Sequence, residues 1–358
     1  MSNNIKYNLF LLMSMLSRNL VEVFSIALLY KLNYSIKEIF LYYSVFFFIS
    51  IFVNIFTIYL TNYIKSMYIL IFSNILFCFS YYFLNNMNYN VKNLIVFALL
   101  SSISSYTYHS IRHYFALRYT DNSNKEIGNI AIFSFIGIII SSYFGPYLTD
   151  RYSLSITIIV MFILSLISVV FLLLINDETI KEKIVRVKIN RSRFLFFVLE
   201  QGKILFLLIQ PLFLYLYVSK DFKYIGVFNL INSVASIIFV YLFVRKMNVK
   251  KWFKWFNLLL ILVLILKLNI FNKYVILIIA FFEGIFVKVY EIVSMKNLYQ
   301  IKTDNIKSYL IKVEVIFCLI RSIFMLIFYL FFKDIKVILY IMLALMFLSS
   351  FCVKRIKE

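Results

Sequence analysis

Long apolar stretches separated by short polar ones repeat along the whole chain. A helix that crosses a bilayer needs about 20 apolar residues. The first stretch is too long for a signal-peptide core, and no small-residue cleavage site follows it. The pattern therefore predicts an all-α polytopic membrane protein with twelve transmembrane helices, near residues 8–30, 38–61, 67–86, 91–117, 128–149, 153–175, 194–219, 222–244, 253–270, 273–297, 307–331 and 335–353.

The longest polar segment divides these stretches equally. It reads NDETIKEKIVRVKINRSR and covers residues 176–193. Six stretches precede it and six follow it, so we expect two six-helix, pseudo-symmetric halves, residues 1–175 and 194–358, joined by a basic cytoplasmic linker. Similarity between the two sequences is weak, and the division depends on the number of stretches and on the linker.

Composition supports a membrane location. Hydrophobic residues make up 63% of the chain and charged residues 15%, with a mean hydropathy of +0.91. Soluble domains have about 45–50% apolar and about 25% charged residues. Cys78, Cys318 and Cys352 lie in apolar stretches without a CxxC partner, which indicates neither disulfides nor zinc. Soluble enzymes, disulfide scaffolds and disordered proteins are excluded, and no metal or cofactor is expected.

The net charge of +21 follows from an excess of lysine and arginine. In a soluble protein this excess would suggest nucleic acid. Here, with the N-terminus inside, 21 of the 37 basic residues fall in inner segments, 10 in outer loops and six within the spans. Basic residues favour the cytoplasmic side. We therefore expect a monomer in the inner (cytoplasmic) membrane, with both termini in the cytoplasm and no nucleic-acid partner.

The loop between the second and third stretches, IYLTNYIKS, contains Leu60, Asn62 and Lys65. Together with the two halves and the basic linker, it resembles the major facilitator superfamily, whose loop here usually reads G-x-L-x-D-R-x-G-R-K. Asn62 stands where that pattern has aspartate, so the match is degraded. The corresponding loop of the second half keeps Arg245 and Lys246 but has no acid.

The fifth stretch, SFIGIIISSYFGPYLTD, contains Gly137, Gly145 and Pro146. It resembles the Gly-Pro motif in helix 5 of the superfamily's drug/proton antiporters, although the closing glycine pair is absent. Small residues permit close helix approach, and proline frees a carbonyl and bends a helix. The alternative is an ordinary helix end. Arg112 falls where the family's helix-4 motif has an arginine, but the glutamine and glycine expected after it are missing.

Two charged residues lie near the middle of the first stretch. Ionisable groups at membrane depth are costly and usually face a cavity or a partner. Arg18 and Glu22 are four residues apart, so they share a helix face and can pair. One interpretation is a structural ion pair. The other is a proton or substrate site, because a carboxylate whose cation partner comes and goes with conformation binds and releases a proton.

The fourth stretch places His109, Arg112 and His113 on one face. Imidazole titrates near neutral pH, so a proton or substrate role is possible. A structural hydrogen-bonded pair is the alternative. Metal binding is disfavoured because no third ligand is apparent and Arg112 would oppose a cation.

The seventh stretch carries Glu200 and Lys203, three residues apart and about two turns from its inner end. We expect them to reach the membrane surface along their apolar stems or to form a cytoplasmic gate pair.

Charges recur in the tenth and eleventh stretches. Glu283 is the deeper cavity candidate, and Lys288 and Glu291 can pair three residues apart. In the eleventh stretch Glu314 and Arg321 share a face. We expect Arg321 to pair with a carboxylate, either Glu283 or Glu22.

These features favour a transporter over an enzyme. In the superfamily, helices 1, 4, 7 and 10 line the central cavity, and each corresponding stretch here carries charge. The leading hypothesis is a secondary active transporter that moves a small molecule by alternating access, coupled to protons and working as an exporter. A lipid-linked oligosaccharide flippase and a facilitated uptake permease are the alternatives. A non-transporting sensor is a further option because the loop motif is degraded.

Overall fold

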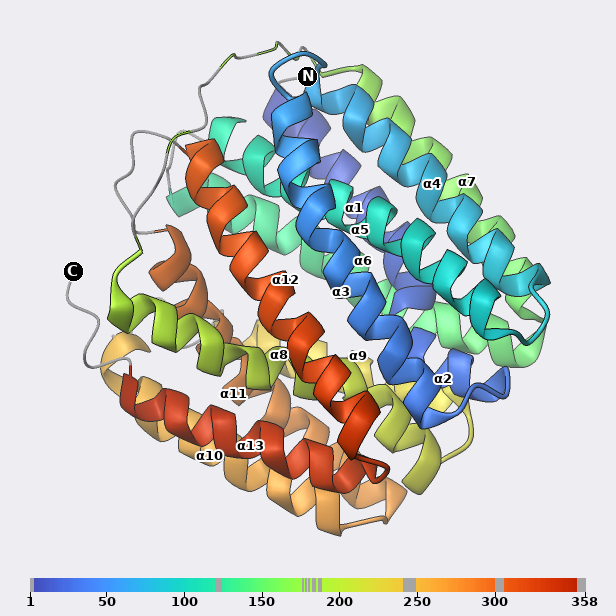
Figure 1. Cartoon of the computed structure of the whole chain (residues 1–358), viewed down its shortest axis with the longest axis vertical. Helices are drawn as coiled ribbons and strands as arrows, with labels where there is room; N and C mark the ends of the chain where they lie inside the picture. The colour runs from blue at the N-terminus through green and yellow to red at the C-terminus, as the bar shows by residue number, and fades with distance from the viewer. Residues whose placement is uncertain are drawn as a thin grey trace. The chain divides into compact units, whose positions relative to one another are not determined.

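The computed structural model describes residues 3–119, 124–175, 177, 179, 181, 185, 189–240, 249–299 and 306–352. The fold is helical throughout these residues (Figure 1). Arg245, Lys246 and half of the predicted linker lie outside them. The helices are α1 (Asn3–Glu22), α2 (Ser25–Lys31), α3 (Ile36–Leu60), α4 (Ser66–Asn86), α5 (Val91–Tyr119), α6 (Asn124–Arg151), α7 (Leu154–Leu173), α8 (Arg191–Tyr217), α9 (Phe222–Phe239), α10 (Val249–Asn269), α11 (Lys273–Tyr299), α12 (Ile306–Phe331) and α13 (Ile335–Cys352).

Each of the twelve predicted stretches contains a long helix, which confirms the all-α polytopic fold. Within the described residues, ten segments are long and apolar enough to cross a membrane. The two remaining long helices, α6 and α11, have 28 and 27 residues. The charged residues along α11 exceed the number that a membrane-spanning window of 18 residues allows, which explains why this helix is not among the ten segments (Lys273, Glu283, Lys288, Glu291 and Lys296).

The first stretch differs from its prediction as a single helix. It breaks after Glu22 and resumes at Ser25, although no proline or glycine lies nearby. The Phe24 N–H donates to the Val21 carbonyl at 3.2 Å, and the Ser25 hydroxyl donates to the Glu22 carbonyl at 3.0 Å. These bonds satisfy carbonyls that the break frees. Irregular backbone at membrane depth is tolerated only where protein or a cavity surrounds it, so the break lies in a protected place.

The chain forms two compact units. Unit 1 contains α1–α7 and α12, and unit 2 contains α8–α11 and α13. In unit 1, α1 packs on α6 and α7, α3 packs on α5, and α4 packs on α5 and α7. In unit 2, α8 packs on α13, α9 packs on α11, and α10 packs on α11 and α13.

Helices at corresponding places in the two runs of six spans therefore pack alike. The pair α9–α11 corresponds to α3–α5, and α8–α13 corresponds to α1 with α7. This repeat in packing supports two pseudo-symmetric halves. Helix α12 departs from this correspondence, since it packs on α3 and belongs to unit 1. The division into residues 1–175 and 194–358 stays a prediction.

Hydroxyl and amide groups join α3 to α12 and α5. Ser44 and Ser322 exchange hydroxyl-to-carbonyl hydrogen bonds of 3.2 and 2.9 Å between α3 and α12. Asn54 of α3 donates to the Cys318 sulfur at 3.4 Å and accepts from Ser110 of α5. Without a hydrophobic driving force in lipid, such bonds and close packing hold helices together.

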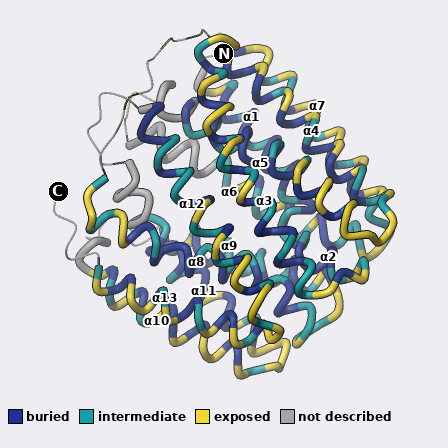
Figure 2. The backbone as a smooth tube through the Cα atoms, viewed as in Figure 1, coloured by how far each residue is buried: buried dark blue, intermediate teal, exposed yellow. Residues whose placement is uncertain are grey.

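Large apolar side chains cover the outside of the helices. Exposed residues run along α4 and α7 (Figure 2), including Phe72, Ile75 and Phe79 on α4 and Ile159 and Phe162 on α7. Such a surface matches a hydrocarbon solvent, since monomeric soluble proteins rarely expose large continuous apolar areas.

Candidate functional site

Charged residues of α1, α5 and α12 gather in unit 1. Glu22 ends α1 at the helix break and is half-buried. Its Oε1 accepts a hydrogen bond from Ser105 of α5 at 3.5 Å. Arg18 and Arg112 both interact with Glu22 electrostatically, but among the described residues neither forms a close ion pair with it.

The Arg18 side chain is buried among neighbours from other helices. Its Nη2 donates to the Ser73 hydroxyl at 2.8 Å and to Asn74 Oδ1 at 3.2 Å, both on α4. The guanidinium lies 4.4 Å from the Phe77 ring centroid and 4.0 Å from that of Tyr108. The structural ion pair with Glu22, one of the two interpretations of the spacing, is not formed among the described residues, and α4 and two aromatic faces hold the guanidinium instead.

The α5 cluster lies beside this arginine. His109 contacts the rings of Tyr106 and Tyr108 edge-on, and it interacts electrostatically with Arg18, Arg112 and Arg321. His109, Arg112 and His113 are all half-buried. Two of the three helices that carry the charges of this cluster, α1 and α5, correspond to helices that line the central cavity in the superfamily.

Arg112 is weakly engaged. Its Nη1 lies 3.8 Å from the Met15 sulfur, and its guanidinium lies 5.7 Å from the Tyr108 ring centroid. The Arg112 backbone carbonyl accepts from the Tyr7 hydroxyl at 3.1 Å, which fixes α5 against α1. A thioether is a weak acceptor, so the described residues leave most of the hydrogen-bonding capacity of this guanidinium unused.

Arg321 of α12 contributes the third guanidinium. It donates from Nη1 to the Tyr106 hydroxyl at 3.0 Å and lies near the rings of Phe47 and Phe317. Glu314 interacts electrostatically with both Arg321 and Arg112. The acid on the same face of α12 is thus an electrostatic partner of Arg321, and a tyrosine of α5 accepts its hydrogen bond. Helical spacing placed Glu314 on the same face as Arg321, but the expected carboxylate partners were Glu283 and Glu22. Neither Glu314 nor Tyr106 was therefore predicted as a partner, and Glu283 pairs with Lys267 instead.

Glu283 has a partner that the sequence analysis did not identify. Its Oε2 lies 2.6 Å from Lys267 Nζ of α10, and both side chains are fully buried inside unit 2. Lys267 also lies near the rings of Phe206 and Phe228. The expectation that Glu283 faces a cavity is corrected to a buried ion pair. Lys267 lies in the last turn of its helix, where a lysine usually reaches the membrane surface.

A second charge cluster lies in unit 2. Lys288 and Glu291 form the predicted ion pair at 2.8 Å. Lys203 lies 4.7 Å above the Tyr290 ring and interacts electrostatically with Glu291. Glu200 and Lys203 are buried, so the prediction that they extend to the membrane surface is wrong. Lys203 of α8 thus joins the Lys288–Glu291 pair of α11 in one group, and Glu200 interacts electrostatically with Tyr290 beside it.

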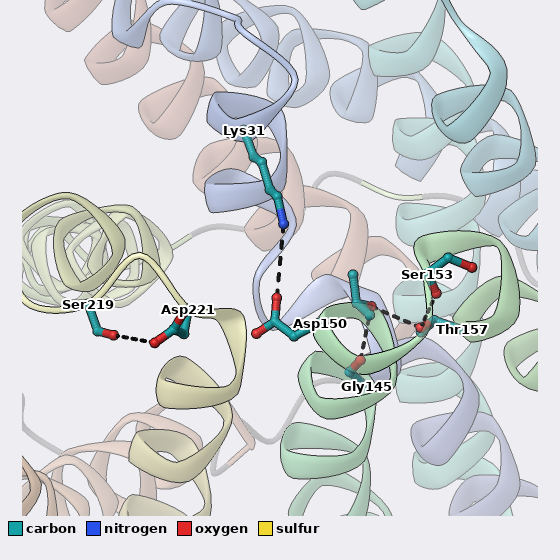
Figure 3. A network of polar contacts seen from close by, with 8 residues as sticks. Lys31, Gly145, Asp150, Ser153, Thr157, Ser219 and Asp221 are labelled. Atoms are coloured by element: carbon teal, nitrogen blue, oxygen red, sulfur yellow. Dashed lines mark hydrogen bonds and ion pairs between the residues drawn. The ribbon is translucent and has the colours of Figure 1, made fainter.

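The glycines of α6 let it approach α1 closely. A Cβ at Gly145 would fall on the Leu20 carbonyl, and a Cβ at Gly137 would lie 2.8 Å from the Leu12 carbonyl and 2.9 Å from Met15 Cβ. Beyond Pro146, the Thr149 hydroxyl donates to the Gly145 carbonyl at 3.0 Å and contacts Thr157. Gly145 thus packs on α1 two residues before its break, and Asp150 at the end of α6 lies 4.0 Å from Lys31 of α2 (Figure 3).

The loop motif contacts α12. Lys307 Nζ donates to Asn62 Oδ1 at 2.7 Å and lies over the Tyr114 ring at 5.0 Å. Lys65 is exposed and precedes α4. The buried Asp177, at the start of the predicted linker, accepts from the Met67 N–H at 3.0 Å. The loop and Asp177 at the start of the linker are therefore both held by unit 1. Within the described part of the chain, no three possible metal ligands come together.

A model of the Major Facilitator Superfamily matches residues 8–289. The chain therefore belongs to this superfamily, as its motifs and topology predicted. It is a multi-pass membrane protein and a secondary transporter of a small molecule, and not an enzyme.

Solved structures share the fold over the full length. An aspartate-to-alanine mutant of the nucleoside transporter NupG has 12% sequence identity and a TM-score of 0.74, with 100% of each chain covered. A second NupG structure has 12% identity and a TM-score of 0.72, with 99% of each chain covered. Similarity at this identity shows the fold alone. No curated protein matches the sequence.

Proposed function

We propose that this transporter couples cargo movement to protons and that Glu22 is the proton-carrying group. The observation that carries the proposal is the setting of this carboxylate. It lies half-buried at a helix break and accepts a long hydrogen bond from Ser105. Two guanidiniums lie near it, and no close ion pair forms with it among the described residues. A carboxylate in such a setting gains or loses a proton when small movements change its distance to the cations.

We propose export as the direction of transport. The support is the resemblance of Gly137, Gly145 and Pro146 to the helix-5 motif of drug/proton antiporters. Facilitated uptake and lipid-linked oligosaccharide flipping are the competing functions. The shared fold with NupG adds nucleosides to the cargo that a test must include.

The test measures proton movement in inside-out vesicles with a pH-sensitive dye. The compounds are lipophilic cations, antibiotics, sugars, peptides, nucleosides and organic acids. We expect at least one of them to dissipate the pH gradient with the wild-type chain, and this response to disappear in Glu22→Gln. Glu314→Gln is the matched control, since Glu314 is the other half-buried acid of the unit 1 cluster. Full activity in Glu22→Gln, or a loss confined to Glu314→Gln, contradicts the assignment.

A further inference from the structure

The charge cluster of unit 1 has an excess of positive charge. Arg18, Arg112 and Arg321 supply three guanidiniums, and Glu22 and Glu314 supply two carboxylates. The two histidines of the chain, His109 and His113, lie on the same stretch of α5. With neutral histidines and ionised acids, one positive charge is left over.

The three arginines differ in how their guanidiniums are engaged. Arg18 donates from Nη2 to oxygen acceptors on α4 and lies against two aromatic rings, while its Nε and Nη1 have no hydrogen-bond partner among the described residues. Arg321 donates to the Tyr106 hydroxyl. Arg112 has a thioether and one distant ring, and no oxygen acceptor among the described residues.

A guanidinium whose hydrogen-bond donors contact no oxygen acceptor in the described residues favours binding of an oxyanion. The guanidinium fork matches carboxylate and phosphate geometry, and such charge-assisted bonds are about twice as strong as neutral ones. Glu22 and Glu314 interact with Arg112 electrostatically, and in the described part of the chain neither carboxylate forms a close ion pair with it. Arg112 is half-buried, so part of its surface is open to a ligand. An organic cation would meet the net positive charge instead and be repelled.

We propose that Arg112 binds an anionic group of the cargo, a carboxylate or a phosphate, and that this transporter carries small organic anions. His109 and His113 lie beside Arg112 and can donate to the same group. The proposal rests on the proposed function because it concerns the same site. It does not depend on proton coupling, because binding takes place without a gradient.

The experiment measures ligand-induced shifts in melting temperature, and then Kd, for the purified full-length protein in lipid nanodiscs. The probes are benzoate, phenyl phosphate, benzyl alcohol and benzylammonium, which share a benzene ring, and adenosine and adenosine monophosphate, which share adenine. The charge therefore varies within each of two ring systems. We expect an anionic probe to bind at least tenfold more tightly than its neutral counterpart. Comparison of benzoate with phenyl phosphate separates carboxylate from phosphate recognition.

Variants assign the binding to Arg112. We expect Arg112→Gln to weaken binding of the anion at least tenfold, and Arg112→Lys to keep part of it. Arg151→Gln is the matched control, since Arg151 is exposed at the end of α6 and donates to Tyr147. Unchanged melting temperatures without ligand verify that the variants fold.

Three results would overturn the anion proposal: no anionic probe binds, neutral or cationic probes bind better, or the anion binds Arg112→Gln as well as wild type. The proton proposal fails separately. If Glu22→Gln keeps full coupling while anions still require Arg112, only the assignment of Glu22 is wrong.

Discussion

At the scale of single residues, helical spacing predicts which side chains share a face but not which neighbours they meet. Arg18 and Glu22 share a face, yet Arg18 is held by Ser73 and Asn74, which are more than 50 residues away in sequence. Glu283 is paired with Lys267 of another helix. Which residues of other helices a side chain contacts depends on how the helices pack, and the periodicity of one segment carries no information on that packing.

The Lys267–Glu283 pair gives a prediction at this scale. Lys267→Met should destabilise the protein by about 3–5 kcal/mol, because it leaves a fully buried carboxylate without its cation. The double variant Lys267→Met with Glu283→Leu should recover most of this loss, since it removes both charges. Thermal unfolding in one detergent measures the three proteins. A double variant as unstable as the single one would contradict a purely structural role.

At the scale of elements, apolar stretches of about 20 residues were sufficient to place every long helix. They missed the break after Glu22, because the local sequence contains none of the usual helix breakers. The break lies where Gly145 of α6 packs on the Leu20 backbone. The glycines of the Gly-Pro motif could be identified from sequence as contact residues, but the segment that they contact could not.

This contact predicts the effect of adding a methyl group. Alanine is favoured over glycine in a helix by about 1 kcal/mol. Gly145→Ala should nevertheless destabilise the protein by about 1–3 kcal/mol, because its Cβ would overlap the Leu20 carbonyl. Gly137→Ala, with contacts of 2.8 and 2.9 Å, should be less harmful. Melting temperatures test the order, and a Gly145→Ala protein as stable as wild type would contradict the close approach of α6 to α1.

At the scale of the whole molecule, span number, linker and loop charge were sufficient to identify the superfamily, which the family match confirms. The grouping of α12 with unit 1 was not predictable, because its apolar surface is like that of the other spans and its contacts with α3 involve scattered serines, an asparagine and a cysteine. Because α12 packs on α3, its charged residues lie in the same unit as those of α1 and α5. Six of the seven residues predicted for the transport path are therefore in unit 1, and the seventh, Glu283, is in unit 2.

The central claim is that Glu22 carries the coupling proton. The most direct measurement compares two activities of Glu22→Gln in proteoliposomes, with a cargo identified in the vesicle test. One activity is exchange of labelled cargo at equal concentrations, and the other is accumulation of cargo driven by a pH gradient. We predict that exchange is retained, because it needs no net proton movement, and that accumulation is lost. Accumulation at the wild-type level in Glu22→Gln would contradict the claim.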